Sequence, residues 1–120
     1  MIYEYEPSQL KKLYENERKM KAKYGPKISF GMISLLNVLE AATNAYDLKC
    51  TVFFYMKHLK GNLKEYYSLS LDKKKSKCRL LIQMLDENGK VLIPNDNEKE
   101  FLKKIKRIRL KELSEHYGEY

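Results

Sequence analysis

The sequence predicts an α+β domain in which an N-terminal helical hairpin packs on a small, mainly antiparallel, twisted β-sheet. Two runs with helical spacing of apolar residues occupy about residues 8–24 and 29–46. Segments that are rich in β-branched and aromatic residues, or that alternate between apolar and polar residues, follow from residue 51. No repeat or linker interrupts the chain, so we expect a single domain over residues 1–120.

The first elements are a short strand and two helices. Ile2–Tyr5 alternates apolar and polar side chains and predicts a strand. Ser8 is expected to cap one continuous amphipathic helix, which Gly25 ends. The second helical run has an apolar face wider than one narrow stripe, so we expect it to be covered. A sheet and the first helix would cover it in an internal core, and a partner protein is the alternative for the second side.

The second half of the chain predicts strands joined by polar turns. A continuous β-favouring run, a cleanly alternating half-buried strand and a nearly continuous apolar central strand stand in order, at residues 51–55, 66–71 and 78–85. The last two should form an antiparallel hairpin. Further turns are expected at residues 61–62 and 86–89, with a loop at 94–97. We assign the ambiguous tail to a short helix up to about residue 105 and an edge strand after it.

Positive charge is concentrated in one quarter of the chain. The net formal charge is +8, and residues 51–80 hold eight basic residues against two acidic ones. A concentrated positive surface attracts polyanions, so this region predicts nucleic-acid binding. A solvated, lysine-rich turn is the alternative. The RNA-binding candidates are Lys57, Lys73, Lys74, Lys75 and Lys77.

Membrane insertion, export and the common nucleotide and zinc motifs have no support in the sequence. No segment approaches the ~18 uninterrupted apolar residues of a membrane span, and the first residues lack the basic region of a secretory signal. We therefore expect a cytoplasmic protein with no membrane partner. GxxxxGK[ST], GxGxxG, HExxH and GxSxG motifs are missing, so no metal and no cofactor are expected. Cys50 and Cys78 are interpreted as reduced packing residues, with a disulfide as the alternative.

A small set of side chains is suited to metal-free cleavage of RNA. The reaction needs a base for the 2′-hydroxyl, cations for the charge that develops on the phosphate, and an acid for the leaving 5′-oxygen. Arginine offers a planar fork to phosphate oxygens, whereas lysine is a compact point charge. Each of these residues also has an ordinary structural role open to it, such as a surface histidine or a salt-bridged arginine. The catalytic candidates are His58, Lys60, Arg79, His116 and Tyr117.

Several short segments, in a fixed order, resemble a known family. They are Asp47-Leu48, His58-Leu59-Lys60-Gly61, Tyr66-Tyr67-Ser68-Leu69, Arg79-Leu80 and Glu112-Leu113-Ser114-Glu115-His116-Tyr117. Over about residues 28–117 they are similar to the HigB branch of the RelE/ParE toxin superfamily. The resemblance implies a RelE-like fold whose concave sheet face takes mRNA within the ribosome.

The resemblance also implies roles for the candidate residues. Lys60 and Arg79 would hold phosphate, and His116 with Tyr117 would orient groups or move protons. His58 matches the histidine that often precedes the family's Leu-Lys-Gly turn. Which residue acts as the general base stays open.

The implied function is that of a toxin in a type II toxin-antitoxin system. It would be a metal-independent, ribosome-dependent mRNA endonuclease that inhibits translation. A HigA-like helix-turn-helix antitoxin would neutralise it, and operator DNA would be contacted only through the toxin-antitoxin complex. The superfamily also contains DNA gyrase poisons, so a gyrase poison or a noncatalytic protein that binds nucleic acid or antitoxin is the alternative.

Overall fold

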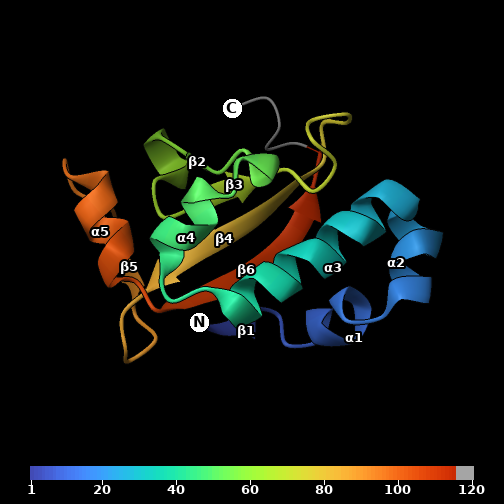
Figure 1. Ribbon diagram of the computed structural model, residues 1–120, viewed down its shortest axis with the longest axis horizontal. Coiled ribbons are helices and arrows are strands. Elements are labelled where there is room, and N and C mark those ends of the chain that lie inside the picture. The colour runs from blue at the N-terminus through green and yellow to red at the C-terminus, as the bar shows by residue number, and fades with distance from the viewer. Residues whose placement is uncertain (116–120) are drawn as a thin grey trace.

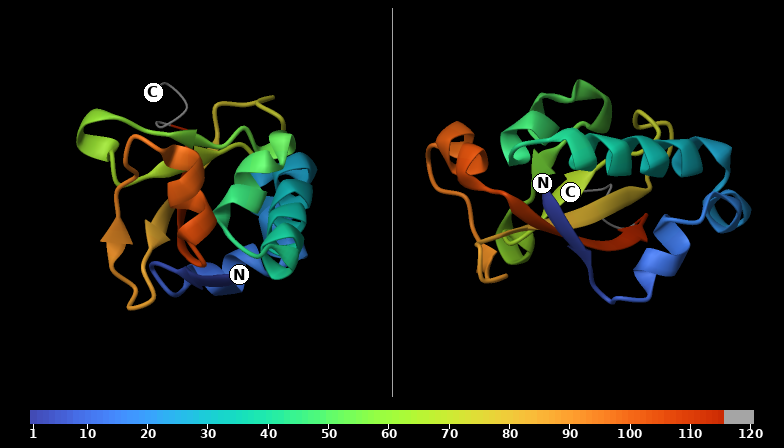
Figure 2. Two further views of the ribbon diagram at one scale, coloured as in Figure 1. Left: turned by 60° about the vertical axis from the view of Figure 1, so that its left-hand side comes forward. Right: turned by 60° about the horizontal axis from the view of Figure 1, so that its bottom comes forward.

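The computed structural model describes residues 1–115 as an α+β fold, as the sequence predicts. Five α-helices and a mixed sheet of six strands lie within this part of the chain. Helices α3 and α4 lie on one face of the sheet, and α5 stands at the end where β5 lies (Figures 1 and 2). In residues 1–115, no helix has the length and apolarity needed to cross a bilayer.

The sheet has the order β1-β6-β4-β3-β2, and β5 pairs with β4. β1 runs parallel to β6, whereas the other pairs are antiparallel. The expected hairpin is confirmed as β3–β4. The expectation that the last strand lies at an edge is wrong, because β6 has β1 on one side and β4 on the other. The strands are β1 (Ile2–Tyr5), β2 (Lys57–His58), β3 (Tyr67–Leu69), β4 (Arg79–Leu85), β5 (Val91–Leu92) and β6 (Arg107–Ser114).

The helices are shorter than the sequence pattern predicts, because asparagine caps interrupt it. Asn16 accepts a hydrogen bond from the backbone N–H of Lys19 at 2.9 Å and starts a new helix where one continuous helix is expected. After α3, Asn44 likewise starts a new helix, because its side chain accepts hydrogen bonds from the backbone N–H groups of Tyr46 and Asp47. Ser8 is not the cap of α1, since that position belongs to Gln9. The helices are α1 (Leu10–Tyr14), α2 (Glu17–Tyr24), α3 (Pro26–Ala41), α4 (Ala45–Cys50) and α5 (Glu98–Lys104).

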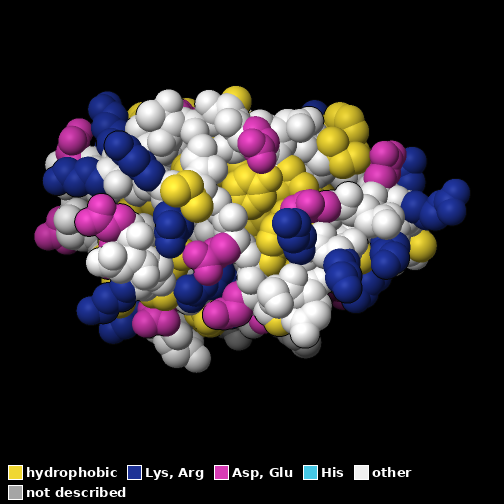
Figure 3. Space-filling view, turned by 90° about the horizontal axis from the view of Figure 1, so that it is seen from below, with side chains coloured by type: hydrophobic (Ala, Val, Ile, Leu, Met, Phe, Trp, Pro, Cys, Tyr) yellow, Lys and Arg dark blue, Asp and Glu magenta, His cyan; other side chains and the backbone are white. Residues whose placement is uncertain are grey.

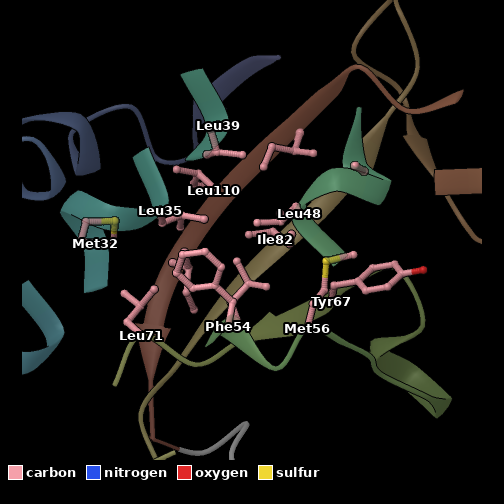
Figure 4. Close-up of a cluster of buried hydrophobic side chains, with 14 of the residues drawn as sticks. Met32, Leu35, Leu39, Leu48, Phe54, Met56, Tyr67, Leu71, Ile82 and Leu110 are labelled. Atoms are coloured by element: carbon pink, nitrogen blue, oxygen red, sulfur yellow. The ribbon is translucent and has the colours of Figure 1, made fainter. Parts of the chain in front are cut away.

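The core lies between the helices and one face of the sheet (Figure 4). The side chains from α3 and α4 and those from β4 and β6 interdigitate there. Burying each such side chain stabilises the fold by about 1.5–3 kcal/mol relative to leaving it exposed. The fully buried members include Met32, Leu35, Leu39, Leu48, Ile82 and Leu110.

The opposite side of β1 and β6 carries charge that is already paired. Arg109 lies 3.5 Å from a carboxylate oxygen of Glu4 and 3.7 Å from one of Glu6. Lys111 also pairs with Glu6. The view from below shows acidic and basic side chains interspersed around an apolar centre (Figure 3). The cations of β6 are therefore not a concentrated positive surface.

The segment expected to be a strand at residues 51–55 is instead a 3₁₀ turn, η1 (Val52–Phe54). Phe54 is buried in the core, whereas Val52 is 74% exposed. Tyr55 follows in the left-handed region at φ +47°. One hydrogen bond, from Ser70 N–H to the Phe54 carbonyl at 2.8 Å, links this turn to the chain after β3. The β-favouring residues thus bury one aromatic ring and leave others at the surface.

Both cysteines are free thiols. Cys78 is buried, which confirms its interpretation as a packing residue. Cys50 is exposed at the end of α4, so the same interpretation is wrong for it.

Candidate functional site

A rigid turn between β3 and β4 carries most of the predicted RNA-binding lysines. Its centre is Asp72, which is 8% exposed and accepts hydrogen bonds from the hydroxyls of Ser70 at 3.2 Å and Ser76 at 2.7 Å. Lys73 and Lys74 lie in the left-handed region, at φ +56° and +62°. The buried carboxylate thus stabilises the backbone conformation of the turn, in which the lysines are exposed. We call Lys73, Lys74, Lys75, Lys77 and Arg79 the turn surface.

Two lysines of the turn surface lie over aromatic rings. The ammonium of Lys73 is 5.2 Å from the ring centre of Phe53, and that of Lys74 is 4.8 Å from the ring centre of Tyr55. These are cation–π distances. Positive charge and aromatic surface are therefore interleaved at this end of the sheet.

A hollow of about 380 Å³ opens beside the turn surface. Phe30, which is 64% exposed, contributes from α3, and Phe53 contributes from η1. Sequence reasoning missed these two rings. A signal for Phe30 was present, since this phenylalanine lies in the helical run predicted at about residues 29–46. The other lining residues are Pro26, Lys27, Leu71, Asp72, Lys73 and Lys75.

Arg79 closes the turn at the first position of β4. Its Nη1 donates to the carbonyl oxygens of Ser76 at 2.8 Å and Cys78 at 2.9 Å. Part of the guanidinium is therefore committed to the main chain of the turn. This bonding fixes the guanidinium beside the lysines, which gives Arg79 a structural role in addition to its charge.

β2 and the loop that follows it hold the remaining described candidates. His58 Nε2 is 2.7 Å from the carbonyl oxygen of Lys64, and its ring lies 5.0 Å from the ring of Tyr67. Because a carbonyl oxygen only accepts, Nε2 carries the proton, which leaves Nδ1 as the ring nitrogen able to take one. Lys60 is exposed just before the 3₁₀ turn η2 (Gly61–Leu63), so a turn is present where one is predicted. We call Lys57, His58, Lys60 and Lys64 the loop surface.

The strand register does not bring Lys60 and Arg79 together. Lys57 pairs with Ser68, which pairs with Leu81. Arg79 comes two residues before that level in β4. Lys60 comes three residues after it, in extended backbone two residues beyond the end of β2, which runs in the same direction as β4. Five residues of strand span about 16 Å. The turn surface and the loop surface therefore lie toward opposite ends of the strands, where Figure 1 shows the yellow loop and β2.

His116 and Tyr117 lie outside the described residues. The strand that leads to them is described as far as its end, and Ser114 pairs with Arg79 in the β4–β6 register. β6 therefore ends beside the turn surface and away from the loop surface.

Two titratable groups near the site are held in their neutral forms. Burial raises the pKa of the Cys78 thiol to about 11, with the carboxylate of Asp72 adding to the effect. Burial, together with the carboxylate of Glu98, raises the pKa of Tyr67. The Tyr67 hydroxyl donates to Glu98 at 3.2 Å. Neither group is poised to act as an anion near neutral pH.

Within residues 1–115, no three histidine, cysteine, aspartate or glutamate side chains are grouped so that they could hold a metal ion. The chain matches no protein family, no curated protein and no solved structure.

Proposed function

We propose that this protein is a HigB-like toxin of the RelE/ParE superfamily, a metal-independent endoribonuclease that cuts mRNA on the ribosome and stops translation. The observation that supports this most strongly is the turn surface. Five cations lie within residues 73–79, on a backbone that is fixed around Asp72, where β6 ends next to Arg79. This arrangement offers phosphate contacts beside the segment that leads to the predicted proton-transferring residues.

The proposed chemistry divides between two groups of residues. The lysines of the turn surface attract the RNA backbone, and Arg79 stabilises the charge that develops on the scissile phosphate. His116 and Tyr117 are the proposed proton carriers for the attacking 2′-hydroxyl and the leaving 5′-oxygen. We assign Lys60, His58 and Lys57 to a second RNA contact, because the register separates Lys60 from Arg79.

The order of elements also agrees with a RelE-like fold. Four α-helices follow the first strand, and the antiparallel β3, β4 and β6 come later in the chain. We further propose the partners of such a toxin: mRNA and the ribosome as targets, and a HigA-like helix-turn-helix antitoxin that neutralises the protein in the cytoplasm. Operator DNA would be contacted only through the antitoxin.

The test is induced expression in growing bacteria, with protein synthesis and transcript ends as readouts. The wild-type chain should stop translation and leave cut transcripts. The double variant His116→Ala, Tyr117→Phe should restore growth while its circular dichroism spectrum stays unchanged. If the folded double variant stays fully toxic, the site assignment is wrong.

A comparison of Arg79→Ala with Lys60→Ala asks which end of the sheet carries the reaction. Arg79→Ala should abolish transcript cleavage, whereas Lys60→Ala should weaken it only modestly. The opposite ranking would move the reaction centre to the loop surface.

A gyrase poison or a noncatalytic binder is the second candidate. It is favoured by the hydrogen bonds that His58 and Arg79 make to backbone carbonyls, because these bonds give both residues a structural role that needs no catalysis. Expression of a gyrase poison would induce DNA-damage signalling and leave transcripts intact. A noncatalytic binder would produce neither damage signalling nor cut transcripts.

A further inference from the structure

The residues that line the hollow beside the turn surface suit a planar ligand that is attached to negatively charged groups. Two phenylalanine rings from separate elements reach it, Phe30 from α3 and Phe53 from η1, and the buried residue Leu71 also lines it. Its volume of about 380 Å³ falls within the ~300–1,000 Å³ of small-molecule pockets. The apolar part of its lining is aromatic and aliphatic carbon, from Pro26, Phe30, Phe53 and Leu71.

Phe30 is an aromatic side chain that α3 leaves exposed to solvent. It is 64% exposed, although α3 buries Met32, Leu35 and Leu39 completely. One exposed apolar residue is ordinary, but Phe30 lines the hollow together with Pro26, Phe53 and Leu71. Apolar surface that separate segments share beside charged side chains marks a binding surface.

The walls of the hollow are held in place before any ligand arrives. A Cβ atom built on Gly31 would stand 1.8 Å from the carbonyl oxygen of Leu71, so only glycine lets α3 approach the chain this closely. Phe30 is the neighbour of Gly31 in α3. On the other side, the Phe53 ring meets the buried ring of Phe54 edge-on, with ring centres 5.2 Å apart. Preorganised walls reduce the entropy that binding costs.

The charge around the hollow selects an anionic ligand. Three of its lining residues are lysines, Lys27, Lys73 and Lys75, against one carboxylate. That carboxylate, Asp72, is nearly buried and accepts two hydroxyl hydrogen bonds. A nucleotide in single-stranded RNA combines a flat apolar base with phosphates on both sides, which matches this pattern.

We propose that the hollow between Phe30 and Phe53 binds an unpaired RNA base, with Lys27, Lys73 and Lys75 contacting the flanking phosphates. Duplex RNA keeps its bases stacked inside, so it meets only the lysines. The inference rests on the proposed function only in taking RNA as the ligand. The turn surface and the hollow together would then favour single-stranded RNA over duplex RNA, in addition to attracting nucleic acid by charge.

The test uses the full-length protein and a fluorescent 2′-O-methyl oligoadenylate of about twelve nucleotides, whose anisotropy reports binding without cleavage. Phe30→Ala should weaken binding by about 5-fold to 100-fold, which is the range for loss of one base-aromatic stack. Phe30→Leu keeps apolar bulk without the π-face and should lose most of the same affinity, whereas Phe30→Tyr should retain it. Ile93→Ala is the matched control, because it removes an exposed apolar side chain that does not line the hollow.

Charge and strandedness are tested with the same assay. Replacing Lys27, Lys73 and Lys75 by alanine should flatten the dependence of log K on log salt by about 2, since each single-strand phosphate contact contributes about 0.7. A duplex of equal length should bind more weakly, and Phe30→Ala should leave the affinity for the duplex unchanged.

The proposal is overturned if wild-type protein does not bind the oligonucleotide, or if Phe30→Leu binds it as tightly as wild type. Equal losses for single strand and duplex would also overturn it. An antitoxin that protects the hollow while RNA does not would assign this surface to a protein partner instead. Because no cleavage is measured, failure of the nuclease proposal would leave these results standing.

Discussion

The hydroxyl of Tyr5 in β1 donates to the carboxylate of Glu15 at a distance of 2.7 Å, which ties the first strand to the junction between α1 and α2. Burial, followed by this bond, raises the pKa of Tyr5. Burial, followed by the bond from its hydroxyl to Glu40, likewise raises the pKa of Tyr3 to about 12. These tyrosines hold their protons more tightly in the folded chain than in the unfolded one.

We therefore predict a loss of stability in alkali. A raised tyrosine pKa contributes stability that is fully present below the unfolded value of about 10 and is lost as the pH rises toward the folded value. Urea unfolding midpoints should fall as the pH rises from about 10 to about 12, and Tyr5→Phe should make that fall shallower. Tyr55→Phe, at an exposed tyrosine, is the control. A steeper fall in Tyr5→Phe would contradict the assignment.

Gly31→Ala should destabilise the protein by at least ~2 kcal/mol, as overpacking against backbone does. The added Cβ would meet the Leu71 carbonyl at 1.8 Å, so α3 or the chain at Leu71 must shift. At other interior helix positions, replacing glycine by alanine stabilises a protein by up to ~1 kcal/mol. The sign of the change in unfolding free energy therefore tells whether the close contact at Gly31 exists. Urea unfolding measures it, with Asn37→Ala on the exposed side of α3 as the control.

Arg79→Ala should loosen the turn surface. The variant loses two hydrogen bonds from a charged donor, and we expect a cost of about 1–3 kcal/mol. Hydrogen exchange should accelerate at the backbone amides of Lys75 and Cys78, which donate within the turn. Lys106→Ala removes an equal charge at an exposed position and should change neither quantity. Unchanged exchange in Arg79→Ala would mean that the arginine does not hold the turn.

The two thiols should differ sharply in reactivity. Cys50 is exposed, whereas Cys78 is buried and its pKa is raised to about 11, chiefly by burial. A maleimide at about pH 8 attacks the thiolate, so the folded protein should take up one label, at Cys50. Unfolding in urea should expose Cys78 to a second label, and mass spectrometry of peptides identifies which cysteine is labelled. Rapid labelling of Cys78 in the folded chain would contradict its burial.

The sequence predicted most elements of the fold, but it misjudged where several of them begin and end. Apolar periodicity marks the face of a helix well, yet it carries no information about interruptions. The break at Asn16 depends on one side chain that satisfies a backbone N–H, and helical spacing continues across it. At residues 52–54 the local preference for a strand is overridden because Phe54 enters the core.

The candidate site was harder to predict because it depends on register. Lys60 and Arg79 both looked suitable by residue type and order. Their separation follows from the pairing of Lys57 with Ser68 and of Ser68 with Leu81, which no local pattern reveals. The hollow between Phe30 and Phe53 likewise joins segments that are distant in sequence, so its rings appeared unrelated before the fold was known.

The parallel pairing of β1 with β6 has a consequence for biosynthesis. Ile2 is synthesised well before its register partner, Arg107, which lies far along the chain. Until then β6 cannot separate β1 from β4, and the sheet lacks both its parallel pair and the strand that ends beside Arg79. A nascent chain that has not yet reached β6 therefore cannot complete the sheet, so the parallel pair forms late when the protein folds during synthesis.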